Sequence, residues 1–315
     1  MQIPPLGQIK EKVTTAFRDV SPLHKYARKP GENYFQYPAN GTRLVFHTIG
    51  LGDIMMIRQF GRAFQAYLAE QGDPELGDIV ITSGGYAPKL DQERGDFNAY
   101  WWYSHGPMDD SPGRFVEDHL RPNLDPEPDV ILCGSKRIER EAQKHGFETL
   151  YFPIAQYGFE PLELKRCGLG YAGSRWHKST KKLQQLLGPF RGRSDFEWVS
   201  DFTLPEQLNL WYNTREATFG VTKEGQRQWG VVNSRVFETL ASGTPLILRD
   251  HPTVNDVLGF EYPYQVSSTE EAKELVDQFS ANPRHTAQEF RSYSRNIRSE
   301  HSYANRVETL VNHVK

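Results

Sequence analysis

The segment WGVVNSRVFETLASGTPLILRD, residues 229–250, holds the side chains whose types and spacing best indicate chemistry. Asn233 or Ser234 is suited to precede a helix, and Gly243 is suited to end it. The free N–H groups at such a helix start favour an anion such as a diphosphate. Glu238 follows about one helical turn later, where its carboxylate could accept the hydroxyl protons of a ribose. The same spacing also fits an ordinary capped helix with a solvated glutamate, so the pattern alone leaves both interpretations open.

Short apolar runs alternate with helical patterns on either side of this segment. Strands are predicted at residues 44–48, 78–84, 129–135, 148–153, 168–174, 195–200, 217–222 and 244–250. Helices are predicted at residues 53–70, 136–146, 179–188, 205–213, 233–243, 269–281 and 284–314. This alternation is typical of parallel sheets covered by helices, whose ligands bind beyond the carboxyl ends of the strands.

We therefore expect an α/β protein with two Rossmann-like, doubly wound domains that face a cleft. Residues 1–40 are polar and rich in proline, and they are predicted to form an irregular arm with one short helix. Residues 41–160 would form an acceptor-binding domain, and residues 161–315 a donor-binding domain whose last helix could return to the first. A chain of 315 residues is long enough for two such domains.

Composition and charge exclude several classes of protein. The net charge of −3 gives no overall field that would recruit nucleic acid or an acidic membrane. Residues 1–160 carry 17 basic against 22 acidic side chains, and residues 161–315 carry 20 against 18, which weakly favours an anionic ligand on the second half. Two cysteines, Cys133 and Cys167, cannot build a disulfide framework or a cysteine-based zinc site. No apolar run has the length of a transmembrane segment or the form of a signal peptide, so a cytoplasmic location is predicted.

Several segments resemble the retaining GT-B glycosyltransferases, especially the CgeB-like (spore maturation protein-like) group. Their Arg-x-Phe-Glu-x-x-Ala-x-Gly run is matched by Arg235, Phe237, Glu238, Ala241 and Gly243. GYAGS at residues 170–174, YFPIAQYGFEP at residues 151–161 and EHSYANR at residues 300–306 resemble further segments of the family. The resemblance covers about residues 43–315. It implies a GT-B fold and a metal-independent, retaining transfer of sugar from a nucleoside diphosphate sugar to an acceptor hydroxyl.

The resemblance also implies the donor-binding residues. Glu238 would bind the donor ribose, and Arg175 and Lys178 would neutralise the leaving phosphates, although both could equally begin a solvated basic helix. The backbone around four consecutive residues would hold the diphosphate: Val232, Asn233, Ser234 and Arg235. The other donor-binding positions would be Gly173, Ser174, Ser200, Thr203 and Gly230. Many relatives carry a second glutamate at the position of Gly230, so either a backbone amide replaces it or the sugar is held differently.

The first half of the chain offers candidates for the acceptor side. Gly50 and Gly52 lie where a strand turns into a helix and would let a substrate approach the backbone. This segment lacks the third glycine of a dinucleotide fingerprint, so dehydrogenase chemistry is disfavoured. The aromatic, turn-rich residues 101–115 are predicted to form a loop facing the cleft, with acceptor contacts from Trp101, Trp102 and Tyr103.

Histidine and aspartate side chains could act on the acceptor hydroxyl. His105 and Asp110 in the predicted loop, with the neighbouring Asp109, could bind acceptor hydroxyls or supply a general base. His47, at the end of a predicted strand, is a further candidate. Each of these side chains could instead have only a surface or structural role. No cluster has convincing spacing for a metal, so no metal and no cofactor beyond a UDP- or GDP-sugar co-substrate is predicted.

Other functions fit the same sequence. The protein could glycosylate modified bases of viral DNA, although its first half is net acidic. It could be a nucleotide-sugar epimerase or phosphorylase, or a non-catalytic protein that binds sugar nucleotides. The acceptor could be a glycan, a protein, a small molecule or a modified nucleic acid, and the oligomeric state is open.

Overall fold

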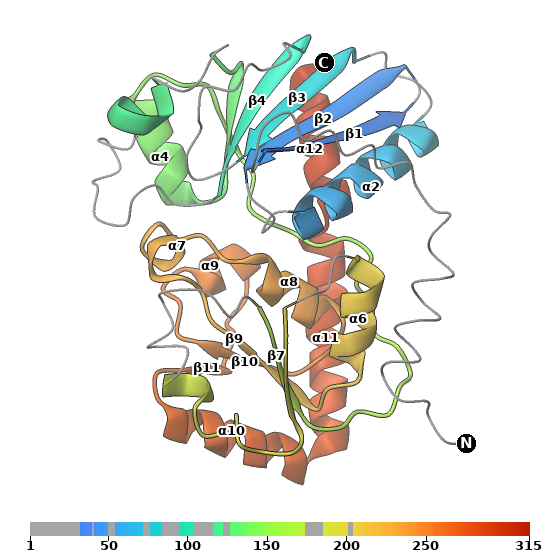
Figure 1. Ribbon diagram of the computed structural model, residues 1–315, viewed down its shortest axis with the longest axis vertical. Helices are drawn as coiled ribbons and strands as arrows, with labels where there is room; N and C mark the ends of the chain where they lie inside the picture. Colours follow the sequence, from blue (N-terminus) through green and yellow to red (C-terminus); the bar gives the residue numbers. More distant parts are fainter. Residues whose placement is uncertain are drawn as a thin grey trace.

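The computed structural model of the chain describes residues 32–39, 41–49, 54–71, 76–83, 95–103, 116–121, 127–173, 185–200 and 204–315. These residues form two lobes, each built on its own sheet, one above the other in Figure 1. The predicted α/β fold with two Rossmann-like domains is confirmed.

The sheet of the first lobe has six strands, whose order in the sheet follows the order in the chain. They are β1 (Glu32–Ala39), β2 (Thr42–Ile49), β3 (Asp78–Ser83), β4 (Phe97–Trp102), β5 (Val130–Cys133) and β6 (Thr149–Tyr151). β1 runs antiparallel to β2, and all other neighbours are parallel. The parallel strands therefore direct their carboxyl ends to one edge, which faces the second lobe (Figure 1).

β1 corrects the prediction of an irregular arm through residue 40. Its side chains alternate, with Phe35 and Tyr37 buried while Gln36 and Pro38 are more exposed. Pro38 cannot donate to a sheet ladder, which suits β1 because it is the edge strand. The buried side chains of this strand alternate with more polar residues, at the spacing of two that is typical of a half-buried strand. No continuous apolar run therefore marked the strand in the sequence.

Helices cover the first sheet. Within the described part of residues 32–160 they are α2 (Ile54–Gln71) and α4 (Lys136–Lys144), with a π-helical turn at η1 (Val116–Leu120). α2 buries Ile57, Phe60, Phe64 and Leu68, whose spacing of three or four residues places them on one face of the helix. Ser135 begins α4 by accepting the N–H of Ile138 at 3.1 Å.

The sheet of the second lobe is entirely parallel, in the order β11-β10-β9-β7-β8. Its strands are β7 (Leu169–Ala172), β8 (Phe196–Val199), β9 (Ala217–Gly220), β10 (Leu246–Arg249) and β11 (Gln265–Val266). The helices of this lobe are α6 (Pro205–Asn213), α7 (Glu224–Gln228), α8 (Ser234–Ala241), α9 (Val254–Leu258), α10 (Thr269–Ala281) and α11 (Pro283–Glu300). Gly243, at a φ of 66°, ends α8 as predicted, and the N–H of Thr244 reaches back to the carbonyl of Thr239 at 3.2 Å.

In the part of the chain that the structure describes, two segments cross between the lobes, and they lie side by side. The predicted helix 284–314 is interrupted at His301 and Ser302, so that α11 lies in the second lobe and α12 (Tyr303–Val314) in the first (Figure 1). Gln156, on the other crossing, donates its N–H to the carbonyl of His301 and accepts the N–H of Tyr303. α12 then packs against α2, where the rings of Tyr303 and Phe60 lie 5.6 Å apart.

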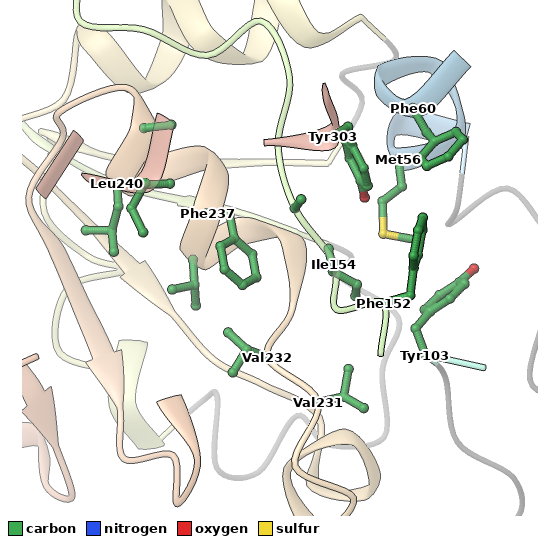
Figure 2. Close-up of a cluster of buried hydrophobic side chains, with 14 of the residues drawn as sticks. Met56, Phe60, Tyr103, Phe152, Ile154, Val231, Val232, Phe237, Leu240 and Tyr303 are labelled. Atoms are coloured by element: carbon green, nitrogen blue, oxygen red, sulfur yellow. The ribbon is translucent and has the colours of Figure 1, made fainter. Parts of the chain in front are cut away.

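Apolar side chains of both lobes meet in one continuous core. Figure 2 shows Val231 and Val232, which precede α8, near Ile154 of the crossing segment. All three side chains are at most 2% exposed. This packing fixes the start of α8 relative to the first lobe.

Candidate active site

The direction in which successive strands are added to the second sheet reverses between β7 and β9. β8 follows β7 on one side, whereas β9, β10 and β11 extend on the other. Ligands of α/β sheets bind beyond the carboxyl ends of the strands at such a switch point. α8 starts at this place, because the side-chain amide of Asn233 donates to the carbonyl of Val221 (3.3 Å) and to Oγ1 of Thr222 (3.0 Å), just after β9.

The start of α8 has free hydrogen-bond donors. Asn233 is the N-cap residue, but its side chain makes no capping hydrogen bond, because its amide is bound to the end of β9. The backbone N–H groups of Val232, Asn233, Ser234 and Arg235 form no hydrogen bond with any other described residue. Consecutive free N–H groups at the positive end of a helix dipole favour an anion.

The Arg235 side chain adds a full positive charge at this place. Its guanidinium lies over the ring of Tyr171 in β7, 4.9 Å from the ring centre, and Nη1 is 3.4 Å from the carbonyl of Val221. Among the described residues no carboxylate lies within ion-pair distance of Arg235. A fixed guanidinium with no carboxylate partner suits the binding of a phosphate group.

The Glu238 carboxylate lies one turn further along α8 and is only 3% exposed. Its Oε1 accepts a hydrogen bond of 2.7 Å from Nε2 of Gln59, which belongs to α2 of the first lobe. Burial raises the pKa of this carboxyl to about 7, while the hydrogen bond from Gln59, the charge of Arg235 and a hydrogen bond from Ser234 oppose the shift. Glu238 is therefore held between the lobes rather than solvated.

Gly230 lies in the turn between α7 and α8 with a φ of 72°, which favours glycine. Its N–H already donates to the carbonyl of Arg227 at 3.1 Å, and its carbonyl accepts the hydroxyl of Thr253 at 3.0 Å. The Gly230 amide is therefore engaged within its own turn, and its contact with the donor sugar stays a prediction.

Comparison with protein families matches residues 159–312 to a model described as "Glycosyl transferase-like". The second lobe is a glycosyl transferase-like domain. This match confirms the prediction that the chain is a glycosyltransferase. Comparison with curated proteins finds no match.

Among solved structures, a mutant of S. aureus TarM in complex with Fondaparinux, alpha-GlcNAc-glycerol and UDP is similar to this glycosyltransferase. It has 10% sequence identity and a TM-score of 0.55, over 100% of this chain and 84% of that one. A DNA-modifying beta-glucosyltransferase has 14% identity and a TM-score of 0.49, over 75% of this chain and 81% of that one. The fold of this glycosyltransferase is thus that of the GT-B enzymes.

The structure corrects the acceptor assignment of three aromatic residues in the glycosyltransferase. Trp101 and Trp102 belong to strand β4 and Tyr103 follows it, and all three side chains are at most 2% exposed. Trp101 packs against Phe60 and Phe152 in the core of the first lobe. The predicted cleft-facing loop therefore does not include these residues, whose rings offer no open face for an acceptor. Their continuous apolar run fits a buried parallel strand.

The other predicted residues fall into two groups. His47 is in β2 and is 6% exposed, Ser200 is exposed at the end of β8, and Gly173 follows β7. The remaining predicted residues lie outside the described ranges: Gly50, Gly52, His105, Asp109, Asp110, Ser174, Arg175, Lys178 and Thr203. The switch point of the second sheet thus brings together Gly173, Arg235 and the free N–H groups before α8, whereas His47 belongs to the other lobe.

The sequence patterns did not indicate which first-lobe residues contact residues 228–238 of the second lobe. Gln59 reaches Glu238, Ser135 donates its hydroxyl to the carbonyl of Trp229 at 2.6 Å, and Arg137 donates to the carbonyl of Gln228. The one available signal was Gln59, a polar residue beside the buried apolar stripe of α2. Nothing in the order of residues indicates which partner it meets in the other lobe.

Two further features are absent from the described ranges of this glycosyltransferase. There, no three histidine, cysteine, aspartate or glutamate side chains are grouped as a metal ion requires. Nor does any helix in those ranges combine the length and apolar character needed to cross a lipid bilayer.

Proposed function

We propose that this enzyme transfers a sugar from a nucleoside diphosphate sugar, with UDP or GDP as the leaving nucleotide, to an acceptor hydroxyl. The observation that carries the proposal is the set of four N–H groups at residues 232–235 that bond to no other described residue, beside the Arg235 guanidinium, which no described carboxylate pairs. This combination suits a diphosphate, and the similar TarM structure contains UDP. Glu238 would accept the ribose hydroxyls, as in the CgeB-like group that the sequence resembles.

In the proposed reaction the bond between the anomeric carbon and the phosphate oxygen breaks, and the acceptor oxygen bonds to that carbon. The acceptor proton leaves with the diphosphate in a retaining, metal-independent reaction. Negative charge grows on the diphosphate in the transition state, so donors already fixed around it lower the barrier. Arg235 and the α8 amides would supply this stabilisation, together with Arg175 and Lys178 as predicted from the sequence. A carbohydrate hydroxyl is the acceptor class that we propose first.

A panel of nucleoside diphosphates tests the donor assignment. We expect UDP or GDP to raise the melting temperature of the protein, because a ligand at about 100 times its Kd stabilises the folded state by about 2.7 kcal/mol. The matching sugar nucleotide should then release its sugar to water or to an added glycan, as followed by mass spectrometry. If no nucleoside diphosphate changes the melting temperature, the proposal is wrong. Binding without transfer to any acceptor would favour the non-catalytic alternative.

Gly173→Ala is expected to lower kcat/KM for the donor by about tenfold. A Cβ at this position would lie 2.6 Å from Nη2 of Arg235 and 2.7 Å from Oη of Tyr171, so both side-chain ends must move away. The guanidinium would then lose its place beside the α8 amides while keeping its charge. Donor kinetics of the purified variant measure the effect. Gly192→Ala is the matched control, because no described atom lies within 4 Å of its added Cβ. Equal kinetics for both variants would contradict the role of Arg235.

A further inference from the structure

Gln59 is a fully buried amide in α2, and both ends of its side chain are hydrogen-bonded. Its Oε1 accepts the backbone N–H of Tyr157, in the segment that crosses between the lobes, at 2.8 Å. Its Nε2 donates to Oε1 of Glu238 at 2.7 Å. Because the N–H of Tyr157 can only donate, Oε1 of Gln59 must face it, and Nε2 must face the carboxylate.

We infer that Gln59 is a positioning residue for Glu238, so that a side chain of the first lobe fixes the position of the carboxylate that receives the donor ribose. This inference rests on the proposed function, in which Glu238 binds the donor. An amide clamped by a backbone N–H has one orientation, and it therefore defines where Oε1 of Glu238 lies. In the proposed function, the second oxygen of the carboxylate would receive a ribose hydroxyl. The first lobe thereby takes part in donor binding as well as in the acceptor binding that the sequence predicts for it.

The hydrogen bond from Gln59 also favours the charged form of the buried carboxylate. A carboxylate with 3% exposure has lost most of its water, and hydrogen bonds must replace it if it is to remain ionised. On α8 itself, Arg235 and Ser234 favour the charged form. Two titratable groups lie on neighbouring elements. The charge of Glu238 acts on Tyr212 of α6, whereas the ring of His301 at the end of α11 lies against Phe237. Gln59 is the neutral donor from the first lobe, and its loss would raise the pKa of Glu238 further.

In the competing interpretation, Gln59 only links the two lobes and does not position Glu238. Helix α2 also carries a control residue for this interpretation. Arg62, one turn after Gln59, forms an ion pair with Glu206 of α6 in the second lobe. This pair is partly exposed and does not touch Glu238, with side chains that are 31% and 39% accessible. Loss of Arg62 therefore weakens contact between the lobes without changing the environment of the carboxylate.

Gln59→Leu is compared with Arg62→Leu in donor kinetics from pH 6 to pH 9. We expect Gln59→Leu to raise the donor KM about tenfold at pH 7, with a smaller effect on kcat, because Glu238 becomes mostly protonated and loses its fixed rotamer. The increase should diminish toward pH 9, where the carboxyl ionises again. Arg62→Leu should leave the donor KM close to that of the unchanged protein at every pH.

Gln59→Glu nearly keeps the shape of the side chain, and it is expected to give the opposite pH dependence of the donor KM. A second carboxyl against Glu238 can donate only while protonated, so donor KM should rise with pH, with a slope opposite to that of Gln59→Leu. The inference is overturned if both Gln59 variants keep the normal KM and pH profile, or if Arg62→Leu raises KM as much as Gln59→Leu. If the unchanged protein binds no nucleoside diphosphate, the proposed function itself fails, which these variants do not decide.

Discussion

Replacing Glu238 with glutamine is expected to weaken donor binding by about 1.5–3 kcal/mol, the range found when a hydrogen bond to a charged group is lost. Two ribose hydroxyls can both donate to a carboxylate, whereas an amide offers one acceptor oxygen and an N–H group that cannot accept. Gln59 would still find an acceptor at this position, so the contact between the lobes is kept. Titration calorimetry with UDP and GDP measures the change. An unchanged donor affinity would contradict the ribose assignment.

The same substitution is expected to stabilise the fold above neutral pH. The pKa of Glu238 is raised by burial from 4.5 to about 7, so ionising it costs free energy in the folded protein but not in the unfolded chain. The cost is absent below about pH 4, grows as the pH rises from 4.5 to 7, and is complete above that. Its full size is on the order of 3 kcal/mol, at about 1.4 kcal/mol for each pKa unit.

Chemical unfolding at pH 5 and pH 8 tests this prediction. Glu238→Gln should gain stability over the unchanged protein at pH 8 and show little difference at pH 5. Glu163→Gln, at a side chain that is 87% accessible, is the matched control and should show no such pH dependence. A destabilised Glu238→Gln at pH 8 would mean that the charged form is fully compensated in the fold. An apparent gain in stability with a loss of ligand binding is the usual mark of a functional charge held in a buried site.

Trp101→Ala is expected to cost about 3–5 kcal/mol of folding free energy, the range for removing a large aromatic side chain from a core. Trp101 is 1% exposed, its ring is packed against Phe60, Phe152 and Tyr303, and its indole N–H donates to the carbonyl of Phe152 at 3.2 Å. Alanine would leave a cavity and a carbonyl without its donor. Urea unfolding measures the loss.

A comparison of stability with acceptor kinetics separates the core role of Trp101 from the acceptor role that its sequence context suggested. Leu164→Ala, at a side chain that is 40% exposed, is the surface control and should unfold at nearly the normal urea concentration. The folded fraction of Trp101→Ala should keep a normal acceptor KM. Normal stability with a raised acceptor KM would instead restore the predicted acceptor contact.

Local sequence patterns predicted several elements of the second lobe closely, although not α7, α9 and β11. α6 was predicted at residues 205–213 and observed as Pro205–Asn213, and α10 was likewise predicted at its observed bounds, Thr269–Ala281. Proline at the first turn of α6 and the capping box at Ser268 of α10 are local signals that need no tertiary contact. The start of α8 was likewise predicted, from Asn233 or Ser234 as the residue that precedes the helix.

The features that sequence patterns failed to predict depend on contacts between distant segments. β4 was missed because its run of aromatic residues is typical both of a buried strand and of a sugar-binding surface. Gln59 and Glu238 are separated by 179 positions, and their contact depends on how two independently patterned lobes dock. The break at His301 and Ser302 was missed because both α11 and α12 have helical periodicity, and only the crossing between the lobes separates them.

The return of α12 to the first lobe has a consequence for how the protein is made. Tyr303, Val307, Leu310 and Val311 are fully buried there, so the first lobe completes its hydrophobic core with residues that follow the whole second lobe in the chain. During synthesis on the ribosome, an apolar face of the first lobe therefore stays uncovered until the second lobe has been synthesised. A fragment that stops at residue 160 would keep this face exposed to water, and it should associate or precipitate instead of folding as an isolated domain.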